Sequence, residues 1–446
     1  MPRKKAAKVE LPTSLKGMHD IVEPDYFAYQ GFFEKASEIA LYYGFKPIEL
    51  PILEKEELLN TTIGENTDIL EKELYSLKTK GGNHLAMRPE GTAGVMRAYI
   101  EHGMQSWPQP VMLYYYGPFF RHENPQRGRY REFRQFGLEI LGTSKSVADA
   151  TVIKVIATML EEAGFKNLIV KINSIGDAES RQAYTKELIS YYKKNLESVC
   201  ANCRQRMKTT PLRLLDCKND KCQSTKTDAP DSIGFLNAPS KKHFKEVLEY
   251  LDALDITYEI DATLVRGLDY YTQTVFEIVE MKDTSTDEKE GDESHDDTQT
   301  AELLSIAGGG RYDYLGKKLG FKKDIQSVGA CIGVDRVIKS PDHKPLDSRI
   351  NKKPKVYFIQ LGFEAKLKSL TVVEMLRKAK IPIMQSLAKD RLSAQLAVAE
   401  KLKIPHTIIL GQREALDNTV IIRNMANRSQ ETVAIPDLPA YIKKEL

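Results

Sequence analysis

Two apolar segments joined by a short polar loop constrain the fold more than any other part of the sequence. Residues 111–123 (VMLYYYGPFFRHE) and 133–142 (FRQFGLEILG) are rich in aromatic and branched side chains. The pattern predicts two antiparallel strands connected by a long hairpin loop. Side chains alternate between the faces of a strand, so Phe136, Leu138 and Ile140 should lie on an apolar face. The opposite, polar face should carry Phe119, Arg121 and Glu123 from the first strand and Phe133, Gln135, Gly137 and Glu139 from the second.

The rest of the chain divides into parts of different character. A length of 446 residues predicts roughly two to four domains. Residues 175–260 have a polar, helical pattern, which predicts a helical domain inserted into a larger domain of residues 1–340. Residues 341–355 are polar and broken by prolines, and we expect a linker there. Residues 356–446 alternate strand and helix patterns, which predicts a small α/β domain with a largely parallel sheet. The expected fold class is therefore α+β with a separate C-terminal α/β domain.

Charge and hydropathy exclude membrane and secreted classes of protein. No stretch approaches the ~18 consecutive apolar residues of a membrane-spanning helix, and the basic N-terminus is not followed by the apolar block of a signal peptide. We expect a cytoplasmic protein with no membrane partner. The last 96 residues contain 17 Lys and Arg against 9 Asp and Glu, which predicts a polyanionic partner. Residues 282–297 contain eight acidic side chains, and we expect residues 282–300 to form a solvated hairpin tip.

The sequence lacks the common phosphate-binding and zinc-protease motifs. It contains no G-x-x-x-x-G-K-[ST] loop, no glycine-rich turn of the dinucleotide-binding type and no H-E-x-x-H helix. A bound nucleotide would therefore depend on arginines that project from a sheet. Arg121, Glu123, Arg129 and Phe133 near the hairpin loop could form such a site, because guanidinium groups bind phosphate and an aromatic ring stacks on a base. The alternative is a surface ion pair between Arg121 and Glu123 beside a solvated basic loop.

A second candidate segment is RPEGTAGVMRAY. Glu90 and Thr92 flank Gly91 just before an expected helix. A carboxylate and a hydroxyl in this position can receive an ammonium group. An acidic residue at the start of a helix is also a common capping pattern, and this alternative stays open.

The remaining candidate segments are LVRGLDYY, GGGRYD and SVGACIGVDRV. Arg266, Tyr270 and Tyr271 are expected on a glycine-broken strand, where they could form a cationic and phenolic wall or could be tyrosines buried for packing. Three consecutive glycines allow a ligand to approach the backbone closely. Arg336 should stand at the start of a helix that follows a strand.

In chain order, these segments resemble the histidyl-tRNA synthetase family of class II aminoacyl-tRNA synthetases. YGFKPIELPILE, which contains Pro51, resembles the first class motif, a helix and strand at the dimer interface. FRHENPQRGRYREFRQFGLEILG resembles the second class motif, and GACIGVDRV resembles the third. RPEGTAGVMRAY and LVRGLDYYTQTVFE resemble the two signatures of the histidine branch. The resemblance extends from about residue 12 to the C-terminus, apart from the acidic segment.

The resemblance implies an activity and a set of partners. The activity is ATP-dependent ligation of L-histidine to tRNA(His) through a histidyl-adenylate, with release of AMP and pyrophosphate. ATP with Mg²⁺ would be a substrate, and the protein would be a homodimer. The sheet would belong to the catalytic domain, residues 175–260 to the helical domain near the acceptor stem, and residues 356–446 to the anticodon-binding domain.

The resemblance also implies roles for individual residues. Arg121 would contact the α-phosphate of ATP, Phe133 would stack on adenine, and Arg129 and Arg336 would hold the outer phosphates, with Glu123 in the same ATP site. Arg121 and Arg266 would be the catalytic residues. The implied histidine-binding residues are Glu90, Gly91, Thr92, Arg121, Gln135, Glu139, Arg266, Tyr270 and Tyr271. Among these, Glu90, Thr92 and Gln135 would receive the amino group, Glu139 and Tyr271 would bond the imidazole nitrogens, and Arg266 would lie beside the carboxylate and the reacting phosphate.

Three departures from the family pattern and two alternative functions accompany this expectation. The first departure is the hairpin tip at 282–300, which is longer than usual and is expected to be inert. Asp335 stands where the third motif usually has glutamate, and Asn124 stands where bacterial relatives often have arginine near the acceptor stem. One alternative is a histidine-sensing regulatory paralogue that has lost catalysis, but such forms generally lack the C-terminal domain. The other is a synthetase for proline or threonine, which Glu139 and LVRGLDYY disfavour.

The cysteines form a separate pattern. Cys200 and Cys203 make a C-x2-C pair, and Cys217 and Cys222 make a C-x4-C pair after a further 13 residues. This spacing is close to that of structural zinc sites. The alternative is four reduced thiols packed in a helical domain. Neither possibility suggests the disulfide framework of a secreted protein.

Overall fold

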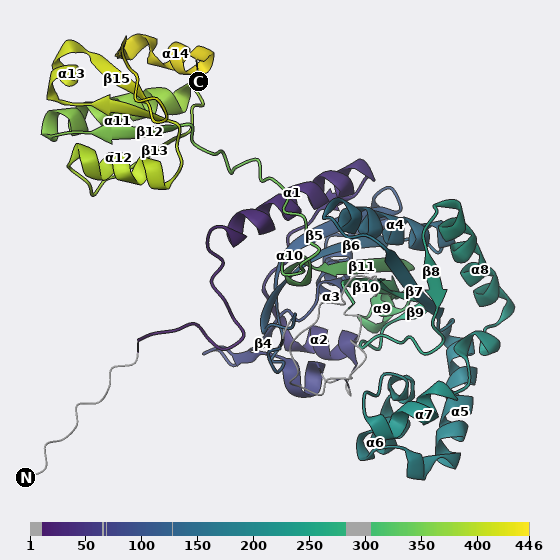
Figure 1. Cartoon of the computed structure of the whole chain (residues 1–446). Coiled ribbons are helices and arrows are strands. Elements are labelled where there is room, and N and C mark those ends of the chain that lie inside the picture. The colour runs from purple at the N-terminus through teal and green to yellow at the C-terminus, as the bar shows by residue number, and fades with distance from the viewer. Residues whose placement is uncertain (1–10, 65–66, 68, 127, 282–304, 446) are drawn as a thin grey trace, which may run out of the picture. The chain divides into compact units, whose positions relative to one another are not determined.

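The computed structural model describes residues 11–64, 67, 69–126, 128–281 and 305–445. The chain forms two compact units, Met1–Ser348 and Arg349–Leu446, and Figure 1 shows the elements of each. The acidic segment 282–300, expected to be a hairpin tip, lies outside the described residues. Within those ranges, no helix has the length and apolar character needed to cross a bilayer.

A large, mainly antiparallel sheet forms the centre of the first unit (Figure 1). In sheet order its described strands are β1 (Lys46–Pro47), β5 (Val111–Phe120), β6 (Glu132–Leu141), β11 (Ser327–Gly333), β10 (Ala307–Arg311), β9 (Thr272–Glu280), β7 (Leu168–Ser174) and β8 (Tyr258–Ile260). The strands from β5 to β7 pair antiparallel, whereas β1 and β8 add in parallel at the edges. The prediction of an antiparallel sheet is confirmed.

The predicted hairpin is β5 and β6, but its first strand is shorter than expected. Phe119 pairs with Phe133, and β5 ends at Phe120. Arg121 and Glu123 therefore lie in the connecting loop and not on the strand. The loop leaves the ladder because the backbone N–H of His122 donates to the carbonyl of Glu73 and because Pro125, without an N–H, cannot extend the pairing.

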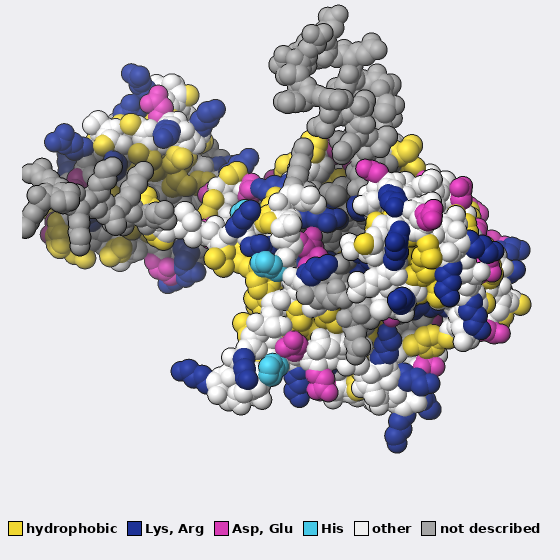
Figure 2. All heavy atoms as spheres, turned by 90° about the horizontal axis from the view of Figure 1, so that it is seen from below, with side chains coloured by type: hydrophobic (Ala, Val, Ile, Leu, Met, Phe, Trp, Pro, Cys, Tyr) yellow, Lys and Arg dark blue, Asp and Glu magenta, His cyan; other side chains and the backbone are white. Residues whose placement is uncertain are grey.

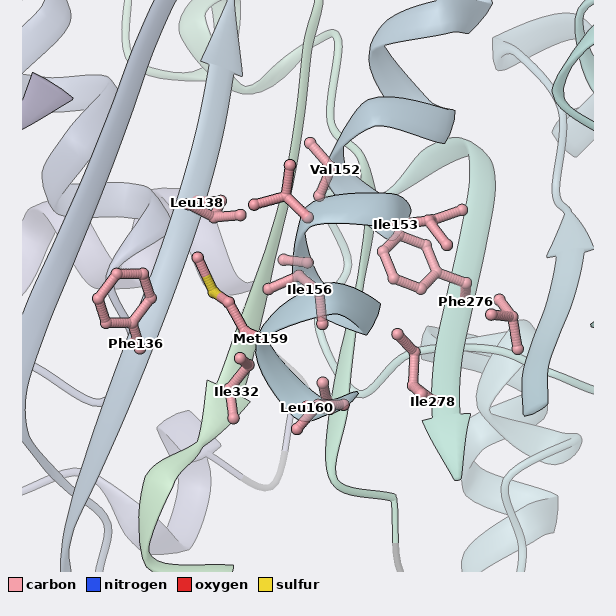
Figure 3. Close-up of a cluster of buried hydrophobic side chains, with 14 of the residues drawn as sticks. Phe136, Leu138, Val152, Ile153, Ile156, Met159, Leu160, Phe276, Ile278 and Ile332 are labelled. Carbon is pink, nitrogen blue, oxygen red and sulfur yellow. The ribbon is translucent and has the colours of Figure 1, made fainter. Parts of the chain in front are cut away.

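The apolar face of the sheet packs against a long helix, as Figure 3 shows. Phe136, Leu138 and Ile140 are buried there, as alternation predicted. The helix is α4 (Ser146–Glu162), whose branched side chains recur at helical intervals and face the sheet. The buried residues of α4 shown in Figure 3 are Val152, Ile153, Ile156, Met159 and Leu160. Burial of each such side chain contributes about 1.5–3 kcal/mol to stability.

Two further helices complete this apolar core. They are α1 (Asp25–Tyr42) and α8 (Ala238–Ala253). Because α8 packs on α4 and β8 pairs with β7, the end of the segment 175–260 belongs to the main core. The helical part with a core of its own comprises α5 (Ala178–Lys194), α6 (Ala201–Thr209), the turns η4 (Pro211–Leu214) and η5 (Asp220–Cys222), and α7 (Gln223–Thr227).

Shorter elements flank the polar face of the sheet. A three-stranded sheet consists of β2 (Leu53–Lys55), β4 (His84–Met87) and β3 (Ser76–Lys78). The neighbouring helices are α2 (Glu56–Ile63), α3 (Thr92–Glu101) and α9 (Leu315–Lys318). The short helix α10 (Val334–Ile338) instead packs its buried valines into the apolar core. The segment between β4 and α3 carries Glu90 and Gly91, so the chain delivers both to the start of a helix.

The second unit is a small α/β domain, but its sheet is only partly parallel. In sheet order the strands are β13 (Ile383–Gln385), β12 (Val356–Gln360), β14 (His406–Leu410), β15 (Thr419–Asn424) and β16 (Gln430–Ala434). The helices are α11 (Phe363–Lys378), α12 (Leu392–Lys401), α13 (Gln412–Asp417) and α14 (Leu438–Glu445). The strands β13, β12 and β14 are parallel, whereas β15 and β16 are antiparallel to their neighbours. The connections to β15 and β16 are too short for parallel crossovers, which need about a dozen residues.

Candidate active site

The polar face of the large sheet is lined by glycines that leave room for larger side chains. Gly329 pairs with Glu139, and a Cβ atom at Gly329 would lie 1.6 Å from Oε2 of Glu139. Gly308 is on the next strand, where a Cβ atom would lie 2.7 Å from Nη1 of Arg266. Only glycine is compatible with both charged side chains lying against the sheet. The glycines therefore form the floor of a site.

Glu139 lies at the centre of this floor, almost fully buried. The hydroxyl of Tyr312 donates to its Oε2 at 2.5 Å, and the hydroxyl of Thr92 donates to its Oε1 at 2.8 Å. Burial raises the pKa of Glu139 to about 8, although these hydrogen bonds oppose the shift. This carboxyl group is buried and held by hydrogen bonds, and its pKa lies close to neutral pH. Such a group is suited to bind a polar ligand that itself titrates.

Glu90 lies beside this group at the start of α3. Its carboxylate accepts hydrogen bonds from the backbone N–H of Thr92 at 2.7 Å and of Ala93 at 2.8 Å. Glu90 is therefore a helix cap, as the alternative interpretation held. It also accepts from the hydroxyl of Tyr270 at 3.2 Å, and burial raises its pKa. The capping contacts hold a buried carboxyl group in the site, so the two interpretations are compatible.

Arg266 reaches the same face from a loop. The predicted strand over residues 264–271 is absent from the described structure, because β9 begins only at Thr272. Arg181 holds this loop through the carbonyl groups of Asp269 and Tyr271, at 3.4 and 3.3 Å. The loop conformation therefore depends on contacts with α5 that the local pattern does not encode.

The surroundings of Arg266 keep it charged. It forms an ion pair with Glu277 of β9. Burial by itself would lower the pKa of Arg266, but the charge of Glu277, together with Tyr271 and Cys331, raises it overall. Burial raises the pKa of Tyr271 to about 12, with the charge of Arg266 acting in the opposite direction. A permanent cation and a neutral phenol thus lie together beside the floor.

Two buried polar atoms on this face have no hydrogen-bond partner among the described residues. They are Oε1 of Gln135 and Nε of Arg266. Gln135 is two residues from Gly137 on β6 and faces the same side of the sheet as Glu139. Buried polar groups in folded proteins nearly always have a partner. These two atoms are therefore available to a ligand.

A second group of charged side chains lies around the hairpin loop. Nε of Arg121 donates to the carbonyl of Pro89 at 2.9 Å, which ties it to the residue preceding Glu90. Its guanidinium also lies over the ring of Phe133, 5.4 Å from the ring centroid. Glu123 forms ion pairs with Arg121 at 3.9 Å and with Arg129 at 3.6 Å. The ion pair of the alternative interpretation exists, but it is largely shielded from solvent and is part of a larger cluster.

Arg336 joins this cluster from α10, the predicted helix after a strand. It donates to the carbonyl groups of Gly128 at 3.1 Å and Ser305 at 2.5 Å. Burial lowers the pKa of Arg336, and the nearby charges of Arg129 and Arg121 lower it further. Two guanidinium groups of the hairpin loop and one of α10 thus lie in one region, and such a cluster can bind a polyphosphate.

Asp335, which stands where the third motif usually has glutamate, has hydrogen-bond partners in the structure. Its two carboxylate oxygens accept from the hydroxyl of Tyr29 at 2.7 Å and from the backbone N–H of Arg134 at 2.5 Å. The shorter acid is accommodated by contacts with α1 and β6. Asn124, another departure from the family pattern, is exposed in the hairpin loop.

Several residues of the site were not singled out from the sequence. They are Tyr115, Arg181, Glu277, Tyr312 and Cys331. Glu277 could have been found, because it is an acidic residue within the otherwise apolar strand pattern VFEIV. Cys331 is on β11, where it pairs with Gly137 and Gly308 of the floor. Burial raises the pKa of its thiol, and the charges of Arg266 and Arg121 oppose this shift. Nothing in the local pattern of Tyr115 or Tyr312 distinguishes them from core tyrosines.

The four clustered cysteines lie apart in the helical insertion. Their sulfur atoms are all within 4.8 Å of one another. The cysteines are free, and those at 203, 217 and 222 are buried. The structure thus brings together all four residues that the spacing paired.

Comparison with known proteins gives matches over nearly the whole chain. The family model described as histidyl-tRNA synthetase matches residues 17–337, and the model described as an anticodon binding domain matches residues 355–445. The histidine–tRNA ligase of Caldicellulosiruptor bescii is 36% identical over 439 residues, which cover 98% of this chain and 99% of the relative. The histidine–tRNA ligase of Aquifex aeolicus is 37% identical over 427 residues, covering 95% and 99% of the two chains.

A solved structure agrees with these matches. The crystal structure of apo Staphylococcus aureus histidyl-tRNA synthetase superimposes with a TM-score of 0.77 at 30% identity. The match covers 97% of this chain and 100% of the Staphylococcus aureus chain. Both units therefore have counterparts in one relative.

Proposed function

Because this chain belongs to the histidyl-tRNA synthetase family, we propose that the polar face of its large sheet binds histidine beside ATP and joins the two. The chain is a histidine–tRNA ligase and catalyses ATP-dependent charging of tRNA(His) with L-histidine. The assignment of individual residues to steps of this reaction is our proposal.

The observation that carries the residue assignment is the pair of unpartnered buried atoms, Oε1 of Gln135 and Nε of Arg266. One is an acceptor and the other is a donor. A free amino acid presents an ammonium group and a carboxylate, which complement them. Glu90 adds a negative charge near the ammonium group, and Thr92 lies next to it. Glu90, Gly91, Thr92 and Gln135 are therefore the proposed amino-group end of the pocket.

The imidazole end of the proposed pocket is formed by Glu139 and Tyr271. Glu139 already accepts from Tyr312 and Thr92, so its orientation is set before histidine arrives. A pocket with buried partners for both ring nitrogens rejects apolar isosteres by roughly 10⁴-fold, because the partners would be left unpaired. Selection of histidine would then need no editing site. Tyr270, which bonds Glu90, completes the wall of the pocket.

The phosphate end of the proposed site is the arginine cluster. Arg121 is held by Pro89 and would contact the α-phosphate, while Arg129 and Arg336 would hold the outer phosphates. Phe133 would stack on adenine. Mg²⁺ would neutralise charge on the outer phosphates, with Glu123 as the carboxylate closest to the arginines.

The proposed chemistry needs no general base. The carboxylate of histidine is already ionised at neutral pH, and one of its oxygens attacks the α-phosphorus while pyrophosphate leaves. The residues must therefore align the two reactants and place positive charge where the transition state gains negative charge. Arg121 and Arg266 are proposed as the catalytic residues in this sense. A ribose hydroxyl at the 3′ end of tRNA then attacks the carbonyl of the adenylate and releases AMP.

The division of labour along the chain is also part of the proposal. Residues 1–340 would form the catalytic domain, interrupted by the helical segment 175–260, and residues 341–355 the linker to an anticodon-binding domain at 356–446. The anticodon-binding domain matched at residues 355–445 supports this division. Figure 2 shows Lys and Arg side chains scattered among acidic and hydrophobic ones. The excess of Lys and Arg over Asp and Glu in residues 351–446, 17 against 9, favours binding of a polyanion. Deletion of residues 356–446 should reduce tRNA charging far more than histidine activation, and equal losses would count against the division.

The homodimer is proposed from the first class motif. Leu41, Tyr42, Ile52 and Leu53, in or beside that motif, are exposed apolar side chains. Apolar side chains clustered on a surface are typical of interfaces. Sedimentation should give twice the chain mass of 50.5 kDa, and a monomer at micromolar concentration would contradict the proposal. A cytoplasmic location is proposed with it, because free cysteines fit a reducing compartment.

The decisive experiment is ATP–pyrophosphate exchange measured with each standard amino acid separately. Histidine alone should support exchange. A second strongly activated amino acid, such as proline or threonine, would contradict the proposed pocket. Histidine binding without any exchange would instead favour a regulatory role.

A further inference from the structure

The four thiols of the helical insertion have the geometry of a metal site. The sulfur of Cys200 lies 3.9 Å from that of Cys217, and the sulfur of Cys203 lies 3.9 Å from that of Cys222. Zinc–sulfur bonds of about 2.3 Å place the corners of a tetrahedron about 3.8 Å apart. All four sulfurs lie within 4.8 Å of one another, so they surround a common centre. We propose that Cys200, Cys203, Cys217 and Cys222 bind one structural zinc ion as thiolates.

The packing around the cysteines favours zinc over four reduced thiols. The separate core of the insertion consists of ten buried residues, and three of them are cysteines. The segment from Val199 to Ala229 has no β-strand, and its longest helix, α6, has nine residues. So short a segment buries little apolar surface, and small units of this kind are commonly held by a metal. Zinc supplies the missing stabilisation.

The charges nearby also match a metal with four thiolates. Zn²⁺ with four thiolates carries a net charge of −2. Residues 200–222 contain six Lys and Arg and two Asp, which leaves an excess of four positive charges. The backbone N–H of Cys200 donates to the sulfur of Cys222 at 3.2 Å, a contact that stabilises a thiolate. The surrounding residues would therefore offset the charge of the bound complex.

The position of the site suggests what the zinc ion does. The turn η4 lies in sequence between the two cysteine pairs. Thr209, Thr210 and Arg213 from this region line one side of a cavity of about 240 Å³, and Arg266 and Tyr271 line the other. Val265, next to Arg266, packs against both the cysteine core and the core beneath the active site. The zinc ion would thus hold one wall of a cavity that opens beside the proposed catalytic arginine.

A consequence follows for the reaction, and it rests on the proposed function. Arg266 is held by Glu277 of the main sheet, which lies outside the cysteine core, so histidine activation should survive loss of the metal. The wall formed by residues 209–213 would lose its support. Transfer to the 3′ end of tRNA, which must enter beside Arg266, should therefore suffer more than adenylate formation.

The test measures zinc in the full-length protein after expression with zinc in the medium. We expect about one zinc per chain, loss of zinc in Cys203→Ser and Cys222→Ser, and retention in Cys331→Ser, the matched control outside the cluster. If the serine variants fail to fold, cobalt can replace zinc in the natural sequence. Thiolate-to-cobalt charge-transfer bands and visible bands of tetrahedral intensity are then expected. Less than about a tenth of a zinc per chain together with no such bands would overturn the proposal.

Activity gives the second measurement. In Cys203→Ser and Cys222→Ser, kcat/KM for tRNA charging should fall by about tenfold or more, with histidine-dependent exchange changed much less. An equal loss in both assays would overturn the role assigned to the metal. Failure of histidine exchange in the natural sequence, with zinc present, would instead refute the proposed pocket and leave the metal site intact.

Discussion

The two faces of the large sheet differ in what they bury. On β6, Phe136, Leu138 and Ile140 point to one face and belong to the core that α4 covers. Figure 3 shows Phe136 and Leu138 on this side of the sheet. Gln135, Gly137 and Glu139 alternate with them and point to the other face. The apolar face gains free energy from every side chain it buries. The polar face buries carboxyl and guanidinium groups whose desolvation costs free energy.

The cost on the polar face is visible in the carboxyl groups. Burial raises the pKa values of both Glu90 and Glu139, so the folded protein disfavours their charged forms. Such groups persist where binding or catalysis requires them. The apolar face therefore stabilises the fold, and the polar face uses part of that stability to hold a preorganised site. Substitutions on the two faces should separate stability from activity.

The largest effect is expected for Arg266→Ala. It removes the cation proposed to stabilise the reacting phosphate, and adenylate formation should fall by roughly a thousandfold. Stability should change little, because Glu277 is only partly buried and can be solvated. Histidine-dependent exchange and urea unfolding measure the two effects. Arg377→Ala, on an exposed helix of the second unit, is the matched control. Near-normal exchange in Arg266→Ala would refute the assigned role.

The opposite result is expected for Ile156→Ala on the apolar face. Ile156 is fully buried against the sheet, and its truncation should lower the free energy of unfolding by about 2–5 kcal/mol. Urea unfolding followed by circular dichroism measures the loss. Exchange per folded molecule should stay unchanged, because the side chain does not reach the polar face. A large loss of activity in Ile156→Ala without a loss of stability would contradict the assignment of stability to the apolar face and activity to the polar face.

Stability should depend on pH through Glu139 on the polar face. Burial raises the pKa of Glu139 to about 8, whereas an unfolded glutamate titrates near about 4.3. Between these values the folded protein keeps a proton that the unfolded chain has released, so this group lowers stability as pH rises through the window. Glu139→Gln stays neutral and should make unfolding less dependent on pH between about 5 and 8. Equal pH dependence in the two proteins would show that Glu139 ionises normally.

The smallest effect is expected where the two faces are connected. The hydroxyl of Tyr29, in the apolar core, donates to Asp335, which precedes Arg336 in the chain. Tyr29→Phe should cost about 1–3 kcal/mol of stability, because a buried carboxylate loses one donor. The KM for ATP should change only slightly, since the backbone N–H of Arg134 still holds Asp335. Tyr250→Phe, at an exposed position of α8, is the control and should change neither quantity.

Strong local patterns were enough to predict much of the fold. Alternation in residues 133–142 identified β6 and the buried side of Phe136, Leu138 and Ile140. The prediction that Arg266 lies on a strand was wrong. Arg266 lies in a loop whose shape depends on hydrogen bonds from Arg181 of α5, a helix that is far away in sequence. The prediction of a largely parallel sheet in the second unit was wrong for β15 and β16. Their short connections allow only antiparallel pairing.

By itself, the sequence determined the strands and helices with strong patterns, the order of the motifs and the family to which the chain belongs. The tertiary structure decided which side chains meet. Tyr312 bonds Glu139, 173 residues away in the chain, and Tyr270 bonds Glu90 over 180 residues. Such contacts depend on strand order and register across several crossovers. Local spacing carries no information about them, because the free energy that selects the register comes from the packing of the whole sheet.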